Sequence, residues 1–81
     1  MGNHDQALNH YQASLNLRRE IGDRRGEGWM LHAIALEYDA VNSHEVAHDY
    51  MLKALGVARD SEDKELLKAC NQILENPFQH K

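Results

Sequence analysis

A chain of 81 residues forms one small domain at most, and its formal charge of −4 argues against nucleic acid or an anionic membrane as the main ligand. Its single cysteine cannot form an internal disulfide, and no apolar run approaches the roughly 20 residues that a membrane span needs. The composition therefore predicts a soluble, cytoplasmic protein that does not enter a membrane.

Helices account for the whole expected fold, because β-branched residues are few and scattered and proline occurs once. The expected helices are, in chain order, about residues 4–21, about 25–41, one that begins after Ser43, and about 62–75. Residues 77–81 come after the last predicted helix and are expected to form a loose tail. The predicted fold class is all-α.

Capping signals mark several of these helix ends. Asn3 and Gln6 have the spacing of a capping box, and Asp23 and Ser43 precede the second and third helices as N-caps do. Gly22 is placed to end the first helix in the left-handed conformation. The turns are therefore expected to be short.

Apolar residues follow the helical period on two sides of the second helix, which predicts that it lies between neighbours. One side consists of Leu31, Ile34, Ala35, Tyr38 and Val41, and the other of Trp29, Ala33, Leu36 and Ala40. The third helix should pack on the second through Ala47, Tyr50, Met51, Ala54, Leu55 and Ala58. Cys70 is expected to serve packing in the fourth helix.

A repeat of about 40 residues runs through the chain, since the pattern of residues 2–15 returns at residues 42–55. Such a period is typical of helical hairpins that stack on one another, because each hairpin alone has too little apolar surface to fold. Stacked hairpins offer a partner an extended face. The repeat therefore favours binding over catalysis.

Residues 22–55 resemble a tetratricopeptide repeat in its long-period variant. The large, small and aromatic positions of its signature match Leu31, Ile34, Ala35, Tyr38, Ala47, Tyr50, Ala54 and Leu55. The resemblance implies antiparallel helical hairpins stacked as a short solenoid. It divides the chain into a half repeat at residues 2–21, a complete repeat at 22–60, a half repeat at 61–76 and a tail at 77–81.

Members of that family bind peptides or helices on a concave face. The matching positions in this chain are Trp29, His32, Leu36, Asp39 and Ala40. Because Trp29 and Leu36 make this face apolar, the resemblance implies a hydrophobic helix or peptide as the partner. The alternative is that Trp29 and Leu36 pack on the chain's own fourth helix.

A zinc-peptidase motif is also present, in the run His44-Glu45-Val46-Ala47-His48. Histidines one helical turn apart can bind zinc, and the glutamate between them can activate a water. A zinc hydrolase also needs a third ligand and a substrate cleft, commonly against a β-strand, and no strand is expected. We therefore expect no metal site. Adventitious metal binding by His44 and His48, with His32 or Asp39 as conceivable further ligands, is a separate alternative.

A non-catalytic protein interaction module without cofactors is the function that these features favour. A structural homodimer, in which a second copy covers the exposed flank of the first helix, is the alternative from a different class. The arginines between Arg18 and Arg25 alternate with acidic residues, so we expect them to form ion pairs.

Overall fold

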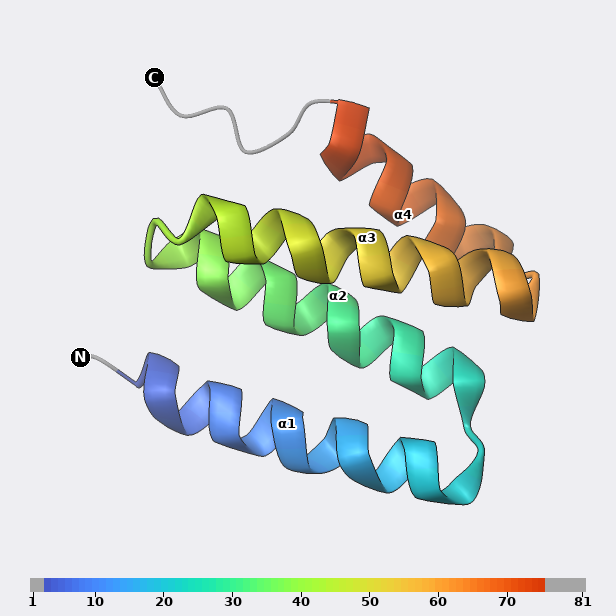
Figure 1. The fold of residues 1–81 in the computed structure, drawn as a ribbon, viewed down its shortest axis with the longest axis horizontal. Coiled ribbons are helices and arrows are strands. Elements are labelled where there is room, and N and C mark those ends of the chain that lie inside the picture. The colour runs from blue at the N-terminus through green and yellow to red at the C-terminus, as the bar shows by residue number, and fades with distance from the viewer. Residues whose placement is uncertain (1–2, 76–81) are drawn as a thin grey trace.

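Four helices make up the computed structural model, which describes residues 3–75 (Figure 1). They are α1 (His4–Ile21), α2 (Arg24–Ala40), α3 (His44–Ser61) and α4 (Lys64–Glu75). The expected all-α class is confirmed, and the helix ends lie within about two residues of the expected ones. The expected tail at residues 77–81 lies outside the described residues.

Consecutive helices run antiparallel and lie side by side, with α2 between α1 and α3 (Figure 1). The helix α2 also contacts α4, which packs mainly on α3. Among the described helices, α1 contacts α2 alone. The prediction that α2 lies between neighbours is therefore confirmed.

The core follows the seam between α2 and α3. Ala35 and Ala47 have no exposed surface, as expected for small residues where two helices cross. The other buried apolar residues are Leu15 of α1, Leu31 and Ile34 of α2, Met51, Ala54, Leu55, Val57 and Ala58 of α3, and Leu66 and Cys70 of α4. A single cluster thus joins all the described helices.

Helices α2, α3 and α4 pack closely at Gly28. A Cβ atom at this position would lie 2.4 Å from Leu66 Cδ2 and 3.1 Å from Val57 Cγ1. The first contact is shorter than Cβ packing allows and the second is tight, so the absence of a side chain lets these helices approach closely.

In the predicted stripes within residues 31–41 and 47–58, three residues are not fully buried: Tyr38, Val41 and Tyr50. Val41 is exposed because it lies just beyond the last turn of α2, at the C-cap. Tyr50 is only half-buried; its ring stacks on Tyr38 at 5.6 Å and lies beneath the ammonium of Lys53. A tyrosine in such a position packs its ring and leaves its polar end near water.

The α1–α2 and α3–α4 turns have the same geometry, 40 residues apart. Gly22 has a φ of 76° and Glu62 a φ of 55°, both left-handed, and the following aspartates donate backbone hydrogen bonds to Arg18 and Ala58. Asp23 and Asp63 then cap the next helix by accepting a hydrogen bond from the backbone N–H three residues on. The caps predicted at Gly22 and Asp23 are confirmed.

The predicted side-chain caps of α1 and α3 are wrong. Asn3 and Ser43 occupy the N-cap positions, but their side chains make no capping hydrogen bond. Asn3 has a ψ of 16°, far from the extended backbone that favours capping. The backbone of Ser43 is close to that of Asp23, but a hydroxyl is one atom shorter than a carboxylate.

Candidate functional site

The residues expected to contact a partner lie together on one side of α2, because they are spaced three and four apart. This side, which we call the α2 face, consists of Trp29, His32, Leu36, Asp39 and Ala40. Leu36 is 41 % exposed, and Ala40 is also exposed. The other side chains are half-buried, so the face is partly built into the fold.

Trp29 is fixed at the junction of α2 and α4 by the carboxylate of Asp63. The Trp29 indole and the Arg25 guanidinium donate to the same oxygen of Asp63, at 3.2 and 3.0 Å, while the Leu66 N–H donates to the other oxygen. Asp63 is only 6 % exposed. Of the two residues that the alternative places against the fourth helix, Trp29 is hydrogen-bonded to the residue just before α4, and Leu36 is exposed.

The charge on Asp63 is held by these donors. Burial by itself would raise the pKa of Asp63, but the Leu66 N–H, the Arg25 guanidinium and the Trp29 indole outweigh it, and the pKa lies below its usual value. A charged carboxylate therefore anchors the tryptophan ring at neutral pH.

His32 lies against Trp29 on the same face. The two rings meet edge to face, with centroids 5.5 Å apart and planes at 67°. Burial lowers the pKa of His32 below its ordinary value, so the imidazole is neutral at pH 7. With a neutral histidine beside tryptophan and leucine, this part of the α2 face is apolar.

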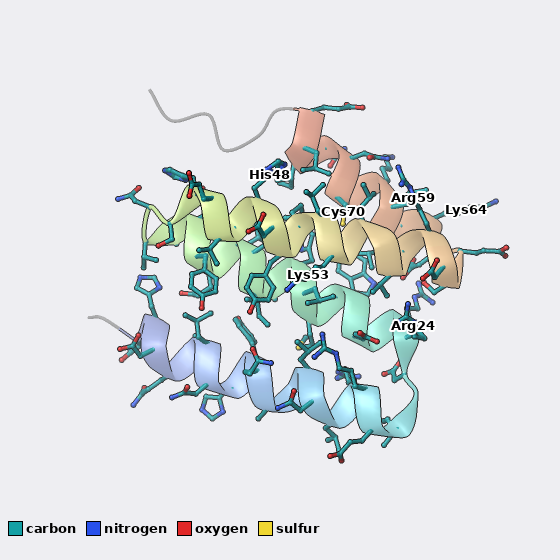
Figure 2. The ribbon with its side chains drawn as sticks, viewed as in Figure 1. Arg24, His48, Lys53, Arg59, Lys64 and Cys70 are labelled. Carbon is teal, nitrogen blue, oxygen red and sulfur yellow. The ribbon has the colours of Figure 1, made fainter. Side chains whose placement is uncertain are left out.

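Asp39, at the far end of the α2 face, contacts the first residue of α3. Its carboxylate oxygen lies 2.8 Å from Nδ1 of His44. Among residues 3–75 there is no group of three or more His, Cys, Asp and Glu side chains that could hold a metal ion. His48, the second histidine of the zinc-peptidase motif, is exposed on α3 (Figure 2). The described structure therefore brings no third ligand to the motif.

The arginines at the α1–α2 corner form ion pairs, as expected. Arg18 pairs with the capping carboxylate of Asp23 at 2.7 Å, and Arg19 and Arg24 both donate to Glu27. The backbone N–H of Gly26 and the Arg18 guanidinium lower the pKa of Asp23, and burial opposes them. These positive charges are thus matched by acids of the same corner.

Other pairs cross from α2 to later helices, which the sequence did not predict. Arg24, labelled in Figure 2, also donates to Asp60 at the end of α3, at 3.1 Å. Arg25 links α2 to Asp63 and, at 3.4 Å, to Glu65 of α4. The 40-residue period places Asp63 at the position of Asp23 and so could have identified it as a cap. Nothing local identifies its contacts with Arg25 and Trp29.

Cys70 is fully buried on the side of α4 that faces α3 (Figure 2). Burial raises the pKa of this thiol to about 11, and the nearby charge of Asp63 acts in the same direction. Such a thiol is a poor nucleophile at neutral pH. Its place in the core cluster agrees with the packing role expected for it.

Two hollows of the described surface lie outside the α2 face. One is at the α3–α4 turn and is lined by Arg25, Ser61, Glu62, Asp63, Lys64 and Glu65. The other lies along α4 and is lined by Lys64, Leu67, Lys68, Asn71, Gln72 and Glu75. Both are open and lined mainly by polar or charged residues. Within residues 3–75, no helix is both long and apolar enough to span a membrane.

The comparison with protein families agrees with the fold. A family model described as tetratricopeptide repeat matches residues 1–60, which is most of the chain. No curated protein and no solved structure matches the chain significantly. The matched segment includes α1, α2, all of α3 but its last residue, and every residue of the α2 face. The chain belongs to the tetratricopeptide repeat family.

Proposed function

We propose that this protein is a non-catalytic interaction module that binds an apolar peptide or helix on the α2 face. The family is one of protein–protein interaction modules in general, and the position of the binding surface is our inference. The observation that supports it most is Leu36, which is 41 % exposed on the same face as the anchored ring of Trp29.

A partner would gain binding energy there from burial and from pre-organisation. Trp29 is held by its hydrogen bond to Asp63, so little side-chain entropy is lost when a partner covers its ring. Aromatic residues in partly dry surroundings commonly dominate binding energy. The neutral His32 costs less to desolvate than a charged side chain would. These properties favour apolar side chains in the partner.

In this proposal, α2 and α3 form one complete repeat, whereas α1 and α4 are halves of a preceding and a following repeat. The protein acts in the cytoplasm, in keeping with its single buried cysteine. Binding needs no cofactor.

Peptides selected from a phage-displayed library of random 16-residue sequences test this proposal. We expect the enriched peptides to carry apolar residues at helical or alternating spacing. Their affinity, measured by fluorescence anisotropy, should fall at least tenfold for Leu36→Lys, because the charge replaces apolar contact at the centre of the face.

Leu52→Lys is the matched control, because Leu52 is 47 % exposed on α3 and lies outside the α2 face. It should leave the affinity unchanged. Circular dichroism should show wild-type helicity for both variants. The proposal fails if no peptide is enriched, or if Leu36→Lys binds the selected peptides as tightly as the wild-type protein does.

A further inference from the structure

An apolar stripe runs along the outer side of α1. Leu17 is 56 % exposed and Ile21 is 67 % exposed. His10, Ala13 and Ser14 continue the same stripe toward the start of the helix, at helical spacings of three, four and seven from Leu17. Among the described helices α1 contacts only α2, which covers its other side through Leu15.

The corresponding side of α3 is covered by another helix, which indicates that such a surface is suited to helix packing. Forty residues after Leu17 stands Val57, which is only 7 % exposed because Gly28 of α2 packs against it. Forty residues after His10 stands Tyr50, whose ring stacks on Tyr38 of α2. The outer side of α1 therefore resembles a helix-packing surface, but none of the described helices covers it.

The α4 helix of another copy does not fit this stripe. Its exposed side is the hollow along α4, in which Lys64, Lys68 and Glu75 are exposed. Placing these side chains on Leu17 and Ile21 would take charges out of water without partners. The exposed side of α4 is thus polar, whereas the outer side of α1 exposes Leu17 and Ile21.

The stripe can meet a copy of itself without burying a charged side chain. Ala13 and Ser14 are small residues at its centre, where they allow two helices to approach closely. An antiparallel copy of α1 related by a two-fold axis at this point would place Leu17 against His10 of the second copy and Ile21 against Gln6. None of these side chains carries a formal charge. The same patch serves both copies, as a two-fold interface requires.

We propose that a second copy of the chain covers this stripe, so that the protein forms a two-fold dimer through α1. Burial of the exposed leucine and isoleucine of both copies drives association. The dimer also offsets the limited core of an 81-residue chain, in which α1 contributes only Leu15 as a buried residue. This interface is separate from the α2 face, and either proposal can fail without the other.

Sedimentation velocity of the untagged chain across a thousandfold range of concentration tests the dimer. We expect the weight-average mass to rise from 9.3 kDa toward twice that value. Leu17→Lys should move the transition to at least tenfold higher concentration, whereas Leu52→Lys, a similarly exposed leucine on α3, and Leu36→Lys should not move it. A monomer at every concentration, or a dimer that Leu17→Lys leaves intact, overturns the proposal.

Cross-linking then tests the symmetry of the interface. Ala13→Cys should form a disulfide dimer under mild oxidation, because the two-fold axis brings this position close to its copy. The control is Gln12→Cys, exposed on the same helix but away from the stripe. Equal cross-linking of both variants would contradict a two-fold axis next to Ala13. A monomer that binds a synthetic peptide of residues 23–41 on this stripe would show that a separate helix, rather than a second copy, occupies it.

Discussion

Two glycines in helix interiors provide a sharp test of the packing, because only Gly28 lies at a helix crossing. An alanine Cβ at Gly28 would lie 2.4 Å from Leu66 Cδ2, whereas a Cβ at Gly56 of α3 meets nothing within 4 Å. Leu66 has no exposed surface, so its methyl group cannot turn into solvent. The added atom therefore forces either a change of the Leu66 rotamer inside the core or a displacement of α4 from α2.

The expected effects differ in sign. Gly56→Ala should increase the free energy of unfolding by about 0.4–1 kcal/mol, because alanine favours the helix and restricts the unfolded chain. Gly28→Ala gains the same helix preference but suffers overpacking that costs about 1–3 kcal/mol. We expect Gly28→Ala to be less stable than Gly56→Ala by about 1–3 kcal/mol. For a domain of this size each kcal/mol corresponds to roughly 4–8 °C in Tm.

Urea unfolding followed by circular dichroism at 222 nm measures both variants under the same conditions. The cause is checked by adding Leu66→Ala, which removes the methyl group that the new Cβ would strike. In the Leu66→Ala background, Gly28→Ala should lower the free energy of unfolding by less than it does in the wild-type protein. The difference between the two effects is the coupling energy between positions 28 and 66. If Gly28→Ala is as stable as Gly56→Ala, the described approach of α4 to α2 is wrong.

Other variants and conditions test the core, the charged caps and the buried thiol. Ala47→Glu should lower the free energy of unfolding by about 3–5 kcal/mol, because it overpacks the core and buries a charge. Val46→Glu, at the exposed neighbouring position, should change it by about 0.5 kcal/mol or less. Equal values for the two variants in urea unfolding would contradict the packing of α3 on α2. The pKa values of Asp23 and Asp63 are lowered from 3.8, so the stability they contribute is present above that pH and is lost as the pH falls through their folded values. Thermal melts should therefore show that Tm falls below about pH 4, and that it falls less in Asp63→Asn than in the wild-type protein. If Tm of this variant falls as much as that of the wild-type protein, the Asp63 carboxylate does not stabilise the fold. Cys70 should react with a thiol reagent at pH 8 only after unfolding, because it is buried and its pKa is about 11; rapid reaction of the folded protein would show that α4 does not cover it.

Local features were sufficient to predict the helices and most of the core. Helical periodicity found the stripes of α2 and α3 because a side chain's direction on a helix depends only on its position in the sequence. It predicted Ala35 and Ala47 to be buried, and neither has any exposed surface. It failed for Tyr50, since a stripe does not show how far a neighbouring helix extends over a residue. The caps were predicted by residue type, which succeeded at Asp23 and failed at Ser43.

The surface that we propose for binding shows the same division. The sequence placed Trp29 and Leu36 on one side of α2, but it left open whether α4 would cover them. That depends on the position of α4, which Gly28, Leu66 and Asp63 set through contacts across almost 40 residues of chain. The two residues differ in the structure, since Trp29 is hydrogen-bonded to Asp63 just before α4, whereas Leu36 is exposed.

By itself, the sequence determined that this protein is built of helices with a 40-residue period and small residues at the crossing of α2 and α3. These properties follow from backbone preferences and side-chain spacing within one helix. Only the tertiary structure decided which apolar residues remain exposed, at Leu36 on the α2 face and at Leu17 on the outer side of α1. Exposure depends on which helices lie next to one another, and each such contact joins residues that are distant in the chain.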